Sequence, residues 1–166
     1  MKVIIITGPP GAGKSTISNL YAQQRPKCVR IETDDIRHMV ITPHMAPWQG
    51  EEGKRQLNLG IQNTCMLAHE FLKADFEVVI ADFLTEYTFP FYKESFEKCD
   101  LKIIQLTAKF DELKKRFVQR GKTITEEEFK MLFDMQEKFT HYDFQIDNTL
   151  LSPEETVNKI KEIISK

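Results

Sequence analysis

The chain has 166 residues with a formal net charge of −2, from 23 basic and 25 acidic side chains. This length suits one domain, spanning residues 1–166, and is too short for two ordinary ones. A nearly neutral balance creates no global basic field, so a long nucleic acid is not an expected partner.

The cysteines and histidines show none of the spacings that typically hold a metal. Cys28, Cys65 and Cys99 are far apart, odd in number and without a CxxC pair, which favours reduced core thiols. No apolar segment has the length of a membrane span, and the sequence begins directly with a strand pattern instead of a cleavable signal. We therefore expect a cytoplasmic protein with no membrane partner.

The first predicted elements surround a phosphate-binding motif. Residues 3–6 are four consecutive β-branched residues, typical of a strand buried on both faces, and residues 15–24 can form a helix. Between them, TGPPGAGKST at residues 7–16 fits G-x-x-x-x-G-K-[ST]. Strand, loop and helix follow in the order that a nucleotide-binding loop requires, although a Gly-Pro turn could also simply join a strand to a helix.

This loop predicts a site for a nucleoside triphosphate, most readily ATP. Its glycines let backbone N–H groups point inward, where the helix N-terminus adds positive potential. Lys14 would reach the β and γ phosphates, the Ser15 hydroxyl would ligate Mg²⁺, and Thr16 would support the helix behind it. The residues predicted to bind the cofactor are Gly8, Pro9, Pro10, Gly11, Ala12, Gly13, Lys14, Ser15 and Thr16.

The next stretch alternates strand and helix patterns with one break. Residues 28–32 alternate apolar and polar side chains as a half-buried strand does, and residues 33–40 begin a short helix. The prolines and glycines of residues 41–53 predict a surface loop. Residues 54–73 then repeat apolar side chains at helical spacing, which predicts a packed helix.

The second half continues the alternation. Residues 76–83 and 101–107 are apolar strands, and residues 109–122 form a helix that Gly121 ends. Two capping-box pairs predict the starts of two further helices. Thr125 and Glu128 form one pair, before a helix over residues 128–139. Ser152 and Glu155 form the other, at the start of the last helix, whose first residue is Pro153. A short strand at residues 144–149 lies between them. The pattern predicts an α/β fold with a parallel sheet covered by helices on both faces.

Candidate chemistry gathers after the strands, because ligands of open parallel sheets lie at the strands' carboxyl ends. Asp34 could accept a proton from a substrate hydroxyl while Arg37, one turn along, binds a polar or anionic part of the substrate. Alternatively, Thr33 or Asp34 caps a short helix and Arg37 is solvated. The capping role and the base role are compatible.

Asp82 is a second acidic candidate because it ends an apolar strand, where a carboxylate is costly unless it faces a polar site. It could hold Mg²⁺ through water, or it could be the base while Asp34 only binds substrate. A plain turn cap is the alternative to both roles.

Two arginines and several aromatic residues complete the candidates. Arg116 and Arg120 share a helix face and could neutralise charge on a transferring phosphoryl group, although Glu112 and Arg116 could form an ordinary i, i+4 pair. The aromatic residues could line an acceptor pocket or fill the core; they are Trp48, Phe83, Tyr87, Phe89, Phe91 and Tyr92.

Four stretches together, GPPGAGKST, DDIR, VVIADF and LKKRFVQRG, resemble the small phosphate-loop (P-loop) kinases over nearly the whole chain. The group that this chain resembles includes the kinase half of polynucleotide kinase, zeta toxins, chloramphenicol phosphotransferase and gluconate kinases. The resemblance implies a three-layer fold with a five-stranded parallel sheet of order 2-3-1-4-5 and a helical lid over about residues 109–139.

The same resemblance assigns roles. It makes Asp34 the general base, or Asp35 if the helix starts one residue later, and Arg37 a ligand of the acceptor. An arginine of the lid, Arg116 or Arg120, would cover ATP, and the stretch after IDNT would lie near the adenine.

We therefore expect an ATP- and Mg²⁺-dependent phosphotransferase that moves the γ-phosphoryl group to a hydroxyl of a small-molecule acceptor. A gluconate-kinase-like activity on a sugar acid is the specific expectation from the resemblance, in a monomer or a homodimer. A nucleotide-dependent switch or hydrolase with a protein partner is one alternative, although no N-K-x-D guanine-reading motif is present. A toxin-like kinase of a nucleotide sugar is another.

Overall fold

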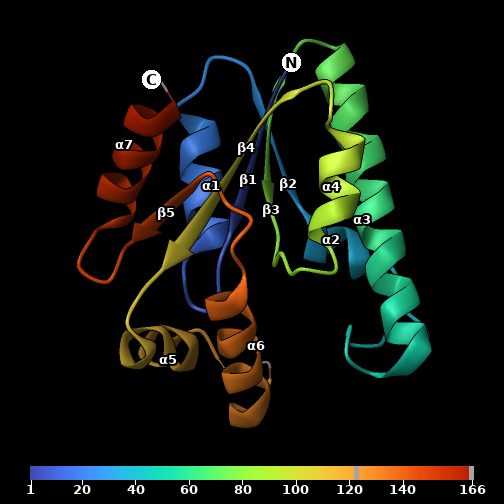
Figure 1. Ribbon diagram of the computed structural model, residues 1–166, viewed down its shortest axis with the longest axis vertical. Coiled ribbons are helices and arrows are strands. Elements are labelled where there is room, and N and C mark those ends of the chain that lie inside the picture. Colours follow the sequence, from blue (N-terminus) through green and yellow to red (C-terminus); the bar gives the residue numbers. More distant parts are fainter. Residues whose placement is uncertain (122–123, 165–166) are drawn as a thin grey trace.

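The computed structural model describes residues 1–121 and 124–164. Their strands form one parallel sheet of five, in the order β2-β3-β1-β4-β5 (Figure 1). The order and direction confirm the predicted fold. The strands are β1 Lys2–Thr7, β2 Cys28–Glu32, β3 Glu77–Ala81, β4 Asp100–Thr107 and β5 Phe144–Asp147.

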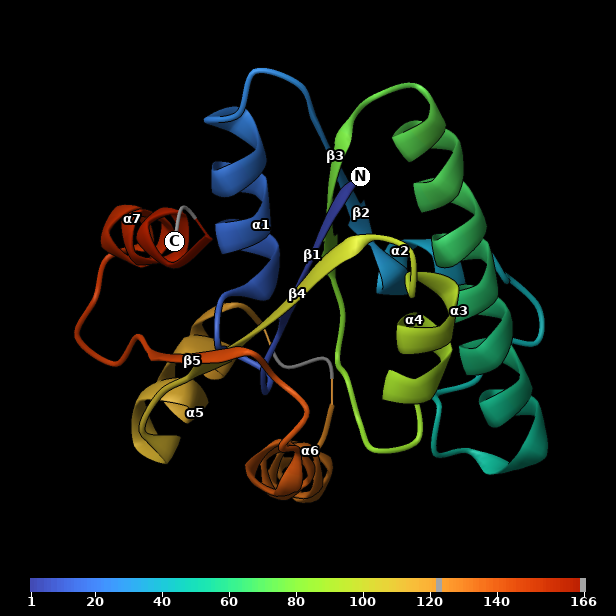
Figure 2. The same ribbon diagram turned by 45° about the horizontal axis from the view of Figure 1, so that its top comes forward.

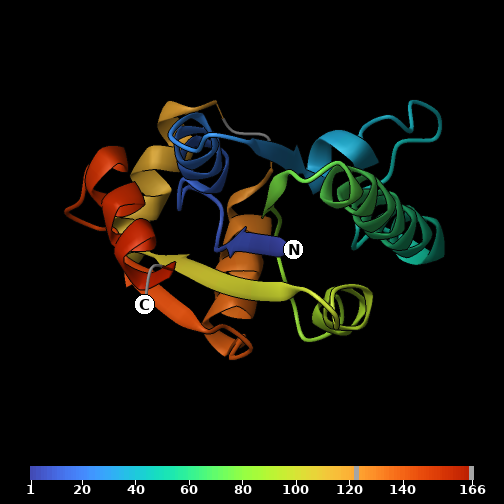
Figure 3. The same cartoon turned by 90° about the horizontal axis from the view of Figure 1, so that it is seen from above.

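Helices cover both faces of the sheet, as predicted. α1 and α7 lie on one face and α3 and α4 on the other, while α5 and α6 lie beyond the carboxyl ends of the strands (Figures 2 and 3). The helices of the described residues are α1 Lys14–Gln23, α2 Thr33–Arg37, α3 Gly50–Lys73, α4 Phe89–Ser95, α5 Phe110–Gln119, α6 Glu126–Lys138 and α7 Pro153–Ile164. No helix in this part of the chain combines the length and the apolar character of a membrane span.

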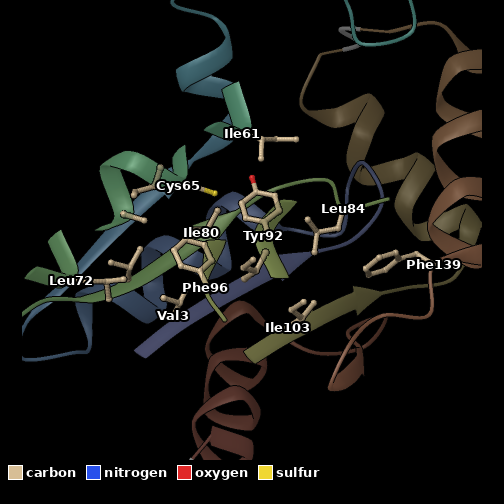
Figure 4. Close-up of a cluster of buried hydrophobic side chains, with 14 residues drawn as sticks. Val3, Ile61, Cys65, Leu72, Ile80, Leu84, Tyr92, Phe96, Ile103 and Phe139 are labelled. Carbon is tan, nitrogen blue, oxygen red and sulfur yellow. The ribbon is translucent and has the colours of Figure 1, made fainter. Parts of the chain in front are cut away.

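The central strand β1 divides the core because its side chains alternate between the two faces. Ile4 and Ile6 pack toward α1 and α7 in one buried cluster. Val3 and Ile5 belong to the other cluster, with residues of α3 and α4 such as Tyr92 (Figure 4). Burial on both faces explains why this strand reads as a continuous β-branched run.

The lid region agrees with its predicted caps. α5 ends just before Gly121, and the capping box of Thr125 and Glu128 is formed at the start of α6. Ser152 and Glu155 also exchange their predicted bonds at the start of α7. Lys122 and Thr123 of the predicted lid, and residues 165–166 of the predicted domain, lie outside the described residues.

The predicted loop at residues 41–53 was too long, because α3 begins at Gly50. A Cβ atom on Gly53 would stand 2.0 Å from the carbonyl oxygen of Ala46. This glycine therefore permits a close approach between the helix and the preceding loop, and does not break the helix. The short helix α2 ends at Arg37 and not at residue 40, and α4 was not predicted as an individual element.

Candidate active site

The predicted phosphate-binding loop joins β1 to α1 at the carboxyl edge of the sheet. Gly8 has φ 149°, and a Cβ atom there would lie 2.4 Å from the carbonyl oxygen of Leu106 on β4. Only glycine fits this approach between the loop and the neighbouring strand. Gly13 is the N-cap of α1, so the loop leads directly into a helix N-terminus, where anions bind.

Lys14 lies where several charges meet. Its ammonium group donates to the carbonyl oxygens of Gly8 at 2.8 Å and Pro9 at 3.4 Å. Burial lowers the pKa of Lys14 to about 8, the attraction of Asp34 and Asp82 opposes this shift, and the repulsion of Arg120 adds to it. Three of the predicted site residues are therefore within electrostatic reach of this lysine.

The Phe83 ring lies beside the same ammonium group. Lys14 Nζ is 5.9 Å from the ring centroid, within the range of a cation–π contact. Phe83 directly follows Asp82 after β3, so the end of this strand brings an aromatic ring next to the loop lysine. Phe83 is therefore a predicted acceptor aromatic that lies beside the phosphate-binding loop.

Ser15 contacts a carboxylate that the sequence analysis missed. Its hydroxyl donates to Glu32 Oε1 at 2.5 Å. The other carboxylate oxygen of Glu32 pairs with Arg30, whose Nε donates to Ser18 Oγ at 3.0 Å. Glu32 is the last residue of β2, whereas the candidates predicted near this strand all follow its end. Alternation along β2 was the signal that could have identified it, because Ile31 is buried and Glu32 is partly exposed at the carboxyl edge.

The Ser15 and Glu32 pair fits a Mg²⁺ ion bound together with a nucleotide. Both groups offer the hard oxygen ligands that Mg²⁺ prefers, and this ion commonly takes one or two protein ligands besides phosphate and water. Within residues 1–121 and 124–164, no group of three or more His, Cys, Asp or Glu side chains could form a cage made of protein alone. The donor set therefore suits a metal completed by phosphate oxygens.

Asp34 lies on the exposed side of α2, with 61% of its side chain accessible. Its Oδ1 accepts hydrogen bonds from Arg37 Nε at 3.3 Å and Arg37 Nη2 at 3.2 Å. The capping alternative was wrong, because no side-chain cap bond starts α2 and the Thr33 hydroxyl pairs with Tyr92. Asp35 is also exposed in the first turn.

Arg37 is buried and largely occupied by the protein itself. Besides Asp34, it donates from Nη1 to the carbonyl oxygen of Met45 at 3.1 Å, and its Nη2 lies 3.1 Å from His38 Nε2. The alternative of a solvated Arg37 was therefore wrong. Few of its N–H groups remain for a substrate. The geometry supports a role in holding Asp34 and the loop at Met45 in place.

Asp82 is almost fully buried at the end of β3. Its Oδ1 accepts from the backbone N–H of Phe83 at 2.8 Å, and its Oδ2 accepts from the Tyr92 hydroxyl at 2.6 Å. Burial raises the pKa of Asp82 to about 6, although the Tyr92 hydrogen bond opposes this shift. Both oxygens of Asp82 accept hydrogen bonds from the protein, whereas the Ser15 hydroxyl donates to Glu32.

The two lid arginines point to different places. Arg116 Nε donates to Glu112 at 3.0 Å, and its Nη groups donate to Asn148 Oδ1 and to the carbonyl oxygens of Asn148 and Thr149. Arg120 instead donates from Nη2 to Thr16 Oγ1 at 2.9 Å. Arg116 therefore fastens α5 to the loop after β5, while Arg120 lies on the phosphate-binding loop.

Asn148 connects this loop after β5 to the nucleotide loop. Its Nδ2 donates to the carbonyl oxygen of Ala12 at 2.8 Å. Asn148 belongs to the IDNT segment, just before the stretch that the resemblance places near an adenine, and this segment touches the phosphate-binding loop directly. The sequence alone did not reveal this contact, which joins residues 136 positions apart.

Comparison with known proteins gave a match to one family model. A family model described as an AAA domain matches residues 4–133. No curated protein sequence gave a match.

Solved structures of kinases resemble the fold. A sugar kinase from a Janibacter species has a TM-score of 0.76 at 14% identity, covering 99% of this chain and 95% of that one. A shikimate kinase from Acinetobacter baumannii, solved with shikimate, has a TM-score of 0.71 at 18% identity, covering 99% and 93%. An APS kinase from Mycobacterium tuberculosis, solved with AMPPNP and APS, has a TM-score of 0.70 at 14% identity, covering 99% and 98%. At these identities, the likeness establishes a shared fold.

Proposed function

We propose that this chain transfers the γ-phosphoryl group of ATP to a hydroxyl of a small-molecule acceptor. The chain belongs to the AAA domain family and is a P-loop kinase. The observation that carries the proposal is that Asp34 and Arg120 both lie within electrostatic reach of Lys14 at the carboxyl edge of the sheet, with Arg120 donating to Thr16 of the same loop. Lys14 would bind phosphate, Asp34 would act as the base, and Arg120 has a side chain long enough to reach the transferring group. Phosphoryl transfer requires these three kinds of group.

Each residue has a part in the proposed reaction. Asp34 accepts the proton of the acceptor hydroxyl through Oδ2, since its Oδ1 is held by Arg37. Lys14 exchanges its two carbonyl partners for phosphate oxygens, and Arg120 leaves Thr16 for the same oxygens. Positive charge from both side chains then stabilises the phosphoryl group as it transfers.

Mg²⁺ would be held by Ser15 and Glu32, and when bound it would neutralise charge on the β and γ phosphates. Asp82 takes a supporting part in this proposal. Its carboxylate attracts the Lys14 ammonium and, through Tyr92 and Thr33, connects the end of β3 to the start of α2. The direct metal role predicted for Asp82 remains the alternative.

Within the class of small hydroxyl compounds, we propose a sugar or sugar acid as the acceptor to examine first. The similarity to the Janibacter sugar kinase supports this choice. The engagement of Arg37 with Met45 and Asp34 favours acceptors recognised through hydroxyl groups over those that need a free guanidinium. A nucleotide sugar is the second acceptor class, and we propose that the protein works in the cytoplasm without a nucleic-acid partner.

The test is a panel of sugar acids, sugars, nucleosides, nucleotide sugars and phenicol or aminoglycoside antibiotics. ATP consumption is followed for each compound, and mass spectrometry identifies a product 80 Da heavier, the mass that a phosphoryl group adds. Lys14→Ala should remove the activity, while Lys98→Ala, an exposed lysine outside the site, should retain it. A Lys14→Ala protein as active as the wild type would contradict the assignment of the loop.

A further inference from the structure

The loop at residues 38–49, between α2 and α3, is fastened to both helices. Gln56 Nε2 donates to the carbonyl oxygen of Pro43 at 2.7 Å, and Gln56 Oε1 accepts from the backbone N–H of Met45 at 3.1 Å. The carbonyl of Met45 in turn accepts from Arg37. Because Arg37 also holds Asp34, this loop and the proposed base form one hydrogen-bonded unit.

Trp48, near the end of this loop, contacts the lid. Its indole Nε1 donates to Glu128 Oε1 at 2.9 Å. The other oxygen of Glu128 accepts from the backbone N–H of Thr125 in the capping box of α6. The Glu128 carboxylate therefore caps the start of α6 and also accepts the hydrogen bond of the indole. This second bond joins two residues that are 80 positions apart in the sequence.

The C-terminal end of α5 contacts the nucleotide loop. Arg120 donates to Thr16 only eight positions before Glu128. α5 and α6 are packed together by aromatic pairs, Phe117 with Phe129 and Phe110 with Phe133, each with ring centroids 4.9 Å apart. The two lid helices therefore pack on each other, and they contact the phosphate-binding loop through Arg120 and the 38–49 loop through Glu128.

The position of these parts in the fold places the contact across the proposed site. α6 and the N-terminal end of α3 both lie beyond the carboxyl edge of the sheet (Figure 1). Lys14 follows β1 and Asp34 follows β2 at this same edge. Thr16 is thus linked to Trp48 by two hydrogen bonds and by the packing of α5 on α6, and hydrogen bonds join the 38–49 loop to Arg37 and Arg37 to Asp34.

We propose that Trp48 and Glu128 are a pair of positioning residues that fastens the 38–49 loop to the lid, so that nucleotide binding under the lid also sets the acceptor side of the site. This inference rests on the proposed function. The pair contacts neither reacting group, and it acts through the lid on Arg120 and through the loop on Arg37. By linkage, a contact that nucleotide binding strengthens must itself strengthen nucleotide binding.

The chain offers a direct probe, because Trp48 is its single tryptophan. Acrylamide quenching of the intrinsic fluorescence is measured with the whole chain, with and without saturating Mg·AMPPNP. In the wild type, the nucleotide analogue should lower the quenching constant of Trp48 by about twofold, since it holds the lid on the loop. In Glu128→Ala this protection should disappear.

Thr125→Ala is the matched control for Glu128→Ala. Both variants lose the capping box of α6, but only Glu128→Ala loses the carboxylate that binds the indole. Protection of Trp48 should therefore persist in Thr125→Ala. Equal loss of protection in both variants would mean that the helix cap alone matters, and this would overturn the proposal.

A second variant measures the same coupling without relying on the helix cap. Trp48→Phe keeps an aromatic ring and removes the N–H donor. It should raise the Kd of Mg·AMPPNP, measured by calorimetry, by about threefold to tenfold, the loss expected for one hydrogen bond of typical net strength. An unchanged Kd would contradict the proposal.

The outcomes also separate this inference from the function on which it rests. Wild-type protein that fails to bind Mg·AMPPNP would contradict the proposed kinase function and the inference together. Normal binding of Mg·AMPPNP with no change in the quenching of Trp48 would overturn the positioning pair alone and leave the kinase proposal standing.

Discussion

Ser15 and Glu32 lie against each other, with the serine hydroxyl donating to the glutamate at 2.5 Å. The contact joins the first turn of α1 to the last residue of β2, so two separate elements supply one pair of oxygen ligands. If this pair holds Mg²⁺, Glu32→Gln should raise the Mg²⁺ concentration that gives half-maximal ATP consumption by roughly tenfold to a hundredfold.

A matched variant separates the metal from the local ion pair. Arg30→Gln removes the Arg30 and Glu32 pair but keeps the carboxylate. Its Mg²⁺ requirement should stay within about threefold of the wild type, because a partly exposed pair contributes little by itself. An equal rise of the Mg²⁺ requirement in both variants would show that Glu32 acts through its ion pair with Arg30 and not as a metal ligand.

The lid arginines should differ in kinetics because they contact different loops. Arg120→Ala should lower kcat by roughly a hundredfold to a thousandfold, since its guanidinium lies on the phosphate-binding loop, ready to meet the transferring group. Arg116→Ala should mainly raise the KM for ATP, because Arg116 supports Asn148 and Thr149. Steady-state rates at varied ATP distinguish the two, and an Arg120→Ala effect confined to KM would contradict the assignment.

The sequence predicted the local features of this site well. The phosphate-binding loop, the caps of α6 and α7 and the alternation of strands and helices each depend on residues within about one helical turn or one strand. Burial of both faces of β1 was also visible as four β-branched residues. The order of the five strands came from the resemblance, and the structure confirms it.

The remaining features depend on contacts that no local pattern encodes. Glu32 meets Ser15 across 17 positions, and Trp48 meets Glu128 across 80. Gly53 was interpreted as a break, because the approach of Ala46 that requires it is visible only in the folded chain. The two lid arginines looked equivalent on a helix face, and only the loops around them give them different partners.

Arg37 should matter for stability as well as for the acceptor. Arg37→Met keeps much of the buried stem but leaves the carbonyl of Met45 without its donor. Such a loss typically costs about 1 to 3 kcal/mol, so the free energy of unfolding in urea should fall by that amount. Met39→Ala, at an exposed neighbouring position, is the control and should change it by less than about 0.5 kcal/mol. Unchanged stability with a large rise in the acceptor KM would instead show that Arg37 binds the acceptor directly.

Asp82 should make stability depend on pH between about 4 and 6. Burial raises its pKa from the ordinary 3.8 to about 6, so the folded protein binds this proton more tightly than the unfolded chain does. The free energy of unfolding is therefore highest below about pH 4, where Asp82 is protonated in both states. It falls as the pH rises from about 4 to 6 and stays at the lower value above this range. A shift of about two pKa units corresponds to roughly 2 to 3 kcal/mol.

Asp82→Asn removes this titration while its amide oxygen and amide hydrogens can still pair with Phe83 and Tyr92. The variant should therefore gain stability relative to the wild type as the pH is raised from 4 to 6, up to that 2 to 3 kcal/mol at pH 7. Urea unfolding at pH 4, 5, 6 and 7 measures the difference. Because the remaining titrating groups are common to both proteins, a difference that stayed constant over this range would mean that the pKa of Asp82 is not raised, and that the buried carboxylate is fully compensated by Tyr92, Phe83 and Lys14.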